Sequence, residues 1–173
     1  LRKLAEVLEN SLDIDGILEL AQTAPELQAP DLKKLIQEDA AFAYHTEEKV
    51  RIGVADDEAF CFFYADNLNL LEQMGAELVT FSPIHDEKLP EDLDGLLLCG
   101  GDPELNGEAL EKNQKMCLAI RNAMEQGMPC LAECGGFMYL HQEMEDMEGH
   151  FRKVCGVIRG RSFRTPRLNR FGY

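Results

Sequence analysis

The chain has 173 residues, 45% of them hydrophobic and 28% charged, which is the composition of a globular protein with a real core. Thirty-two acidic residues against seventeen basic ones give a net charge of −15, which disfavours nucleic acid and anionic membranes as partners. No stretch reaches the roughly 20 apolar residues that span a bilayer, and the N-terminus lacks the layout of a signal peptide. We therefore expect a cytoplasmic protein.

The pattern of the sequence changes near residue 49. Residues 1–20 carry apolar side chains at helical spacing, and Asp13 is placed to begin a second short helix. A looser stretch with two prolines follows, and then a mixed helical segment around residues 32–36. We expect residues 1–48 to be a helical linker and residues 49–173 to form the main domain.

Short apolar runs alternate with amphipathic helices in the second part. The expected strands are residues 51–55, 77–81, 94–101 and 128–132, and the expected helices are residues 65–75, 104–126 and 135–142. Apolar strands separated by helices are typical of parallel strands covered on both faces. We therefore predict a doubly wound, mostly parallel α/β sheet that binds ligands at the carboxyl ends of its strands.

The segment LAECGGFMYL (131–140) has the layout of a nucleophile elbow, because an apolar strand runs into Cys134, two glycines and a helix. Unpaired N–H groups at a helix start favour a thiolate, and the N–H of Gly135 is placed to hold a developing oxyanion. The alternative is a buried cysteine before a helix that needs glycine to turn. Glu133, beside the cysteine, is a candidate substrate contact whose direction the sequence does not fix.

Another glycine pair lies earlier in the chain, at the end of the apolar run in LLLCGGDPEL (96–105). Backbone amides at Gly100 and Gly101 are candidates for the second oxyanion donor. Such a pair alone is typical of an ordinary turn between a strand and a helix. Two glycine turns at neighbouring strand ends, one of them holding a cysteine, favour a catalytic site.

The remaining cysteines form no CxxC pair and mostly lie in apolar runs, so we expect buried, reduced thiols and neither a metal site nor disulfides. They are Cys61, Cys99, Cys117, Cys130 and Cys155.

Histidines offer no evident base. His45 lies in the linker, and His85 and His150 are expected to be solvated. His141 follows Cys134 by seven residues on the same expected helix, about 10 Å along its axis, which is too far for a general base.

Residues 50–105, 131–140 and 154–173 resemble the glutamine amidotransferase domain of the cobyrinic acid a,c-diamide synthase family, and residues 9–21 resemble the end of its ATP-using domain. The resemblance implies a flavodoxin-like class I glutaminase fold and a glutamine-hydrolysing carbon–nitrogen ligase. It implies that Cys134 attacks L-glutamine and that Gly100, Gly101 and Gly135 form the oxyanion-hole region. Ammonia would then amidate the a and c carboxylates of cobyrinic acid in cobalamin biosynthesis, using ATP and Mg on the synthetase domain of a longer parent protein, which also binds the corrinoid.

Two features depart from that family. No GxxxxGK[ST] phosphate loop occurs, and the resemblance places the catalytic histidine downstream of FGY (171–173). We therefore expect the chain by itself to bind no cofactor and to be folded but inactive. An uncovered sheet edge or face would favour self-association, so a homo-oligomer stays open.

Alternatives to this function remain. A related tetrapyrrole acid, hydrogenobyrinic acid or a nickel sirohydrochlorin, could be the one amidated. The domain could instead dock a partner without catalysis, or be a redox or hydrolytic cysteine enzyme. The resemblance assigns no role to residues 60–68.

Overall fold

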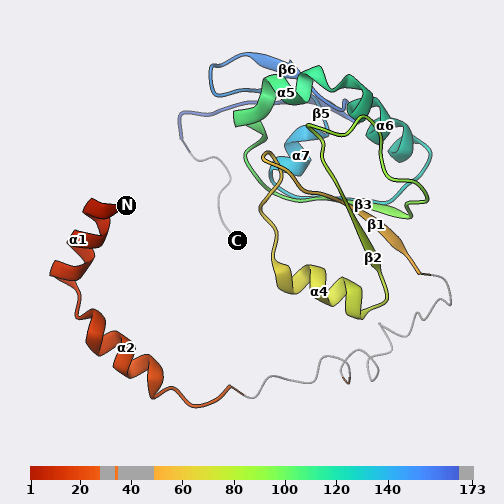
Figure 1. The fold of residues 1–173 in the computed structure, drawn as a ribbon. Helices are drawn as coiled ribbons and strands as arrows, with labels where there is room; N and C mark the ends of the chain where they lie inside the picture. The colour runs from red at the N-terminus through yellow and green to blue at the C-terminus, as the bar shows by residue number, and fades with distance from the viewer. Residues whose placement is uncertain (28–33, 35–48, 168–173) are drawn as a thin grey trace. The chain divides into compact units, whose positions relative to one another are not determined.

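The structure, a computed structural model, describes residues 1–27, 34 and 49–167 (Figure 1). It divides the chain into two units, Leu1–Asp39 and Ala40–Tyr173. The predicted boundary after residue 48 borders residues outside the described ones and stays a prediction. The helical segment expected around residues 32–36 lies outside the described residues except for Lys34.

Among its residues 1–27, the first unit has the short helices α1 (Arg2–Ser11) and α2 (Ile14–Gln22). The side chain of Asp13 accepts a hydrogen bond from the Gly16 N–H at 3.0 Å, so the predicted start of the second helix is confirmed. Neither helix buries a residue. Within the described part of the chain, no helix is long and apolar enough to cross a membrane.

The second unit is built on a four-stranded parallel sheet with the strand order β2–β1–β3–β4. Its strands are β1 (Arg51–Ala55), β2 (Glu77–Phe81), β3 (Gly95–Leu98) and β4 (Cys130–Ala132). Val54 pairs with Leu97, and Leu97 in turn with Leu131. All four carboxyl ends therefore meet at one edge of the sheet, as predicted.

Helices cover both faces of this sheet (Figure 1). On one side lies α4 (Ala65–Gln73), which Gly75 follows at φ 101°. On the other side lie η2 (Pro103–Asn106), α5 (Gly107–Lys112), α6 (Gln114–Glu125) and α7 (Gly135–Tyr139). Apolar residues of α5 and α6 are fully buried in one core with Leu96 and Leu98. The predicted doubly wound α/β architecture is confirmed.

The single helix expected over residues 104–126 is wrong, because the segment breaks into η2, α5 and α6. The break lies at Asn113, whose backbone leaves the helical region. Its side chain accepts from the Met116 N–H and donates to the carbonyl oxygens of Pro83 at 2.8 Å and Asp86 at 2.7 Å. Asparagine forms such local bonds in competition with a continuous helix.

The helix expected over residues 135–142 is also wrong, because α7 ends at Tyr139. A second sheet follows, with the order β6–β5–β7. It consists of β5 (His141–Glu145), β6 (Phe151–Lys153) and β7 (Ile158–Ser162), with β5 antiparallel to β6 and parallel to β7. Met144 of β5 is buried and packs into the same core as the first sheet.

Candidate active site

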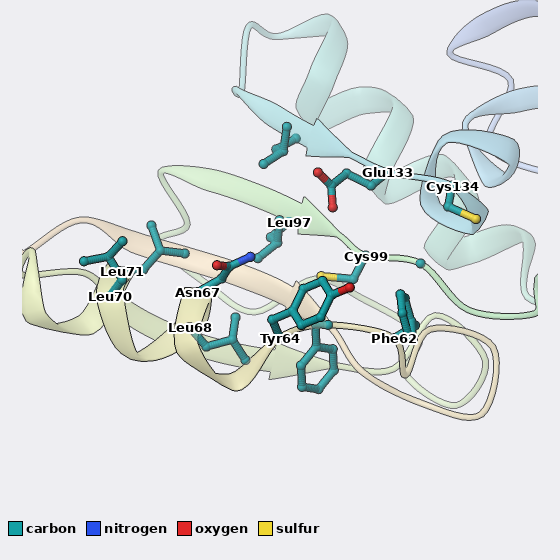
Figure 2. A pocket seen from close by; sticks show the side chains of 13 residues that line it. Phe62, Tyr64, Asn67, Leu68, Leu70, Leu71, Leu97, Cys99, Glu133 and Cys134 are labelled. Atoms are coloured by element: carbon teal, nitrogen blue, oxygen red, sulfur yellow. The ribbon is translucent and has the colours of Figure 1, made fainter. Parts of the chain in front are cut away.

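A cavity of about 350 Å³ opens at the carboxyl ends of β3 and β4 (Figure 2). Its wall comes from the loop before α4, from α4 itself and from the two strand ends. The residues that line it are Phe62, Phe63, Tyr64, Asn67, Leu68, Leu70, Leu71, Leu97, Cys99, Gly100, Leu131, Glu133 and Cys134. The predicted nucleophile therefore lies at a concave, mostly apolar site of the kind that binds small molecules.

Cys134 occupies the turn between β4 and α7 with a strained backbone. Its φ is 48° and its ψ is −112°, and its side chain is exposed. An L-residue rarely adopts a positive φ, and strain of this kind gathers at functional sites. The turn has the geometry of a nucleophile elbow, which presents one side chain above the end of a sheet.

Two glycines allow the backbone to close around this turn. The Gly136 N–H donates to the carbonyl oxygens of Cys99 at 3.0 Å and Glu133 at 2.9 Å. A methyl group on Gly136 would lie 2.6 Å from the carbonyl carbon of Leu98, and one on Gly101 would lie 2.8 Å from that of Ala59. No side chain fits at either position without moving the backbone.

The structure brings the four predicted site residues together. A methyl group on Gly100 would lie 3.5 Å from Cβ of Cys134, and one on Gly135 would lie 3.0 Å from the carbonyl oxygen of Gly101. No acceptor among the described residues takes the Gly135 N–H. The two glycine turns thus face one another across the cysteine, as their spacing after neighbouring strands predicted, and their roles remain a proposal.

The segment that the sequence left unassigned forms the opposite wall of the cavity. The N–H of Phe62 donates to the carbonyl oxygen of Gly100 at 3.0 Å. The Phe60 side chain is buried, and the centroid of its ring lies 5.2 Å from that of Tyr139 on α7. These contacts tie the segment to the Gly100 turn and to the end of the helix that follows Cys134, and only the tertiary fold reveals them.

Asp57 fixes the start of this segment. One carboxylate oxygen accepts from the N–H groups of Ala59 and Phe60 at 2.9 and 3.2 Å. The other accepts from the Ser82 hydroxyl at 2.7 Å and the Ile84 N–H at 2.9 Å. The residues after β1 and β2 are therefore held as one unit next to the cavity.

The other cysteines differ in their surroundings. Cys99, Cys117 and Cys155 are buried as predicted, and Cys130 is half-buried, with burial raising the pKa of its thiol to about 11. Cys61 is exposed, so the expectation that it is buried is wrong. It lies in the loop that leads to the cavity, next to Phe60, whose side chain is the buried one.

The three described histidines do not line the cavity. Nε2 of His85 lies 2.9 Å from the carboxylate of Glu58, and this hydrogen bond raises the pKa of His85. The expectation that His141 continues the helix of Cys134 is wrong, because it begins β5, and its Nδ1 lies 3.0 Å from the carbonyl oxygen of Phe137. His150 is exposed, and His45 lies outside the described residues.

One group in the described part has the spacing of cation ligands, namely Asp146, Glu148 and His150. The buried Asp146 carboxylate already accepts from the N–H groups of Glu148 and His150 at 3.0 and 2.8 Å and from Nε of Arg152 at 2.7 Å. These bonds close the turn between β5 and β6, and they account for the carboxylate without a metal ion.

The fold and the strained cysteine turn define a flavodoxin-like domain of the class I glutaminase type. Residues 51–167 match the CobB/CobQ-like glutamine amidotransferase domain, and the chain belongs to this family. It is 40% identical over 173 residues to the cobyrinate a,c-diamide synthase of Caldanaerobacter subterraneus and 42% identical over the same length to that of Dehalococcoides mccartyi strain CBDB1. In both comparisons the whole chain matches 36% of the relative.

A synthase of the same name from Methanosarcina acetivorans is 46% identical over 144 residues, which are 83% of this chain and 28% of that protein. The chain thus spans little more than a third of the length of the curated relatives it matches.

Proposed function

We propose that Cys134 is the nucleophile of a glutaminase reaction that releases ammonia for an amidation. Its thiolate attacks the side-chain amide carbon of L-glutamine, and the C–N bond then breaks. The amide nitrogen takes up a proton and leaves as ammonia, while the glutamyl group stays on sulfur as a thioester. Water cleaves the thioester to give glutamate and the free thiol. The observation that carries this proposal is the strained, exposed position of Cys134 at the cavity.

The backbone around the cysteine supplies the oxyanion site in this proposal. The free N–H of Gly135 is one donor, and the Gly100–Gly101 turn, whose Cα atoms face Cys134 and Gly135, supplies the other. Each such donor contributes roughly 10²- to 10³-fold to the rate of acyl transfer. The proton acceptor of the thiol is the histidine that the family resemblance places after residue 173.

The ammonia is consumed by a synthetase domain of the intact protein. The relatives are named cobyrinate a,c-diamide synthases, and on that basis we take the acceptors to be the a and c carboxylates of cobyrinic acid. The synthetase domain would bind the corrinoid and activate its carboxylates with ATP and Mg. Residues 49–173 then form the glutaminase domain and residues 1–48 the linker to its partner domain, in a cytoplasmic enzyme.

The test compares two nitrogen donors in the intact protein. Cys134→Ala should lower glutamine-dependent amidation by about 10⁴-fold or more, while amidation with ammonium chloride should continue at the wild-type rate. Offering cobyrinic acid, hydrogenobyrinic acid and nickel sirohydrochlorin in parallel identifies the acceptor. Glutamine hydrolysis that survives in Cys134→Ala would overturn the proposal.

A further inference from the structure

Glu133 places a carboxylate in the cavity beside the proposed nucleophile. Figure 2 shows its side chain directed into the cavity, between Cys134 and Leu97. It is the only charged residue among those that line the cavity, whose other polar side chains, apart from the cysteines, are Tyr64 and Asn67. A single negative charge therefore faces a space that is otherwise apolar or neutral.

The main chain of Glu133 is fixed, but its carboxylate has no partner among the described residues. Its N–H donates to the carbonyl oxygen of Leu98 at 3.0 Å, and its own carbonyl oxygen accepts from the Gly136 N–H at 2.9 Å. These bonds set the direction of the side chain at the end of β4. The carboxylate of Asp57, after β1 at the same edge, is by contrast hydrogen-bonded to the protein.

The charge of Glu133 acts on the wall of the cavity. Burial, and then the negative charges of Glu133 and Asp56, raise the pKa of the Cys99 thiol. No lysine or arginine lines the cavity to balance that charge. A ligand that brings its own cation would gain a charge-assisted hydrogen bond there, and such bonds are about twice as strong as neutral ones.

L-Glutamine has a cation at a suitable place. Its ammonium nitrogen lies four bonds from the amide carbon, which is about 5 Å in an extended chain with ordinary bond lengths. The side chains of Glu133 and Cys134 leave adjacent residues of one turn and line the same cavity. With the amide carbon bound near Cys134, we expect the ammonium group to meet the Glu133 carboxylate in the cavity that both residues line.

We propose that the Glu133 carboxylate binds the α-ammonium group of L-glutamine and thereby selects an α-amino acid amide over other amides. This inference rests on the proposed glutaminase function. Glu133 contacts the substrate but takes no part in bond breaking. Its loss weakens binding of glutamine and leaves the chemistry at Cys134 intact.

The test uses L-glutamine and glutaramate, which carries the same side-chain amide and carboxylate but no α-amino group. In the intact protein, Glu133→Gln should raise KM for glutamine about 10- to 100-fold, as expected for one lost charge-assisted hydrogen bond. The kcat should stay within about threefold, and kcat/KM for glutaramate should change by no more than about threefold. Glu133→Asp keeps the charge and should raise KM for glutamine less.

Glu72→Gln is the matched control, because it removes the same charge from an exposed position of α4 outside the cavity. This variant should leave kcat and KM unchanged for both glutamine and glutaramate. If Glu133→Gln lowers kcat/KM equally for glutamine and glutaramate, or changes neither, the inference is wrong.

The two proposals fail separately. Glutamine hydrolysis that persists in Cys134→Ala overturns the glutaminase function itself. An inactive Cys134→Ala together with a Glu133→Gln variant that binds glutamine like the wild type overturns only the role of Glu133. Ammonium-dependent amidation at the wild-type rate shows in either case that the variant protein is folded.

Discussion

The backbone of Cys134 leads to a prediction about stability that is independent of catalysis. Replacing Cys134 by alanine or by glycine removes the thiol in both cases, but only glycine adopts φ 48° and ψ −112° without strain. Holding an L-residue in a sparsely populated region costs about 1–3 kcal/mol. Glycine also lowers stability by roughly 0.5–1 kcal/mol, because its unfolded chain has more conformational freedom to lose.

The difference leaves Cys134→Gly more stable than Cys134→Ala by about 1 kcal/mol, which corresponds to a midpoint of thermal unfolding about 4 °C higher. Equilibrium urea unfolding followed by far-UV circular dichroism measures it. Cys130 on β4 is the matched control, because it has an ordinary strand backbone. There the order should reverse, with glycine less stable than alanine by roughly 1 kcal/mol. If Cys134→Ala is as stable as Cys134→Gly or more stable, the backbone at residue 134 is not strained as proposed.

Three further predictions concern packing, acid and thiol chemistry. Gly136→Ala should lower the free energy of unfolding by about 3 kcal/mol, because its methyl group meets a backbone carbonyl. Gly75→Ala lies in open space at φ 101° and should lower it by only about 1–2 kcal/mol. Urea titration measures both values. Burial acts to raise the pKa of Asp146, but hydrogen bonds outweigh it and lower the pKa to about 2. Its contribution to stability is therefore complete above the unfolded pKa of about 3.9 and is lost as pH falls toward 2. Asp146→Asn should unfold more easily than the wild type at pH 7, and this difference in stability should shrink as pH falls through 2. A difference that does not change with pH would contradict this. Brief iodoacetamide labelling near neutral pH should modify Cys134 before Cys130, whose pKa burial raises to about 11; peptide mapping that finds the reverse order would count against an accessible nucleophile.

The parallel sheet could be predicted because its strands are short apolar runs. Residues 51–55 and 77–81 match β1 and β2 to the residue. The candidate site followed from two glycine pairs, each placed after such a run, since parallel strands end at one edge of a sheet. The positions of Cys134 and Gly100 at the ends of neighbouring strands could therefore be predicted without knowledge of the loops.

The second sheet could not be predicted in the same way. The sequence of β5, HQEME, contains no β-branched or aromatic residue and consists largely of helix formers, so the pairing with β6 and β7 overrides its local preference. The cavity wall at Phe62 depends on a contact with Gly100, far away in the chain. Neither the propensity of a segment nor its periodicity records such a contact.

The most direct test of the central claim is covalent capture of the nucleophile by a glutamine mimic. 6-Diazo-5-oxo-L-norleucine carries an electrophilic carbon in place of the amide and alkylates a thiol that attacks it. Peptide mapping of the intact protein after brief exposure should show one adduct, on Cys134, and excess L-glutamine should slow its formation. An adduct on the exposed Cys61 with Cys134 unmodified, or labelling that L-glutamine does not slow, would contradict the account.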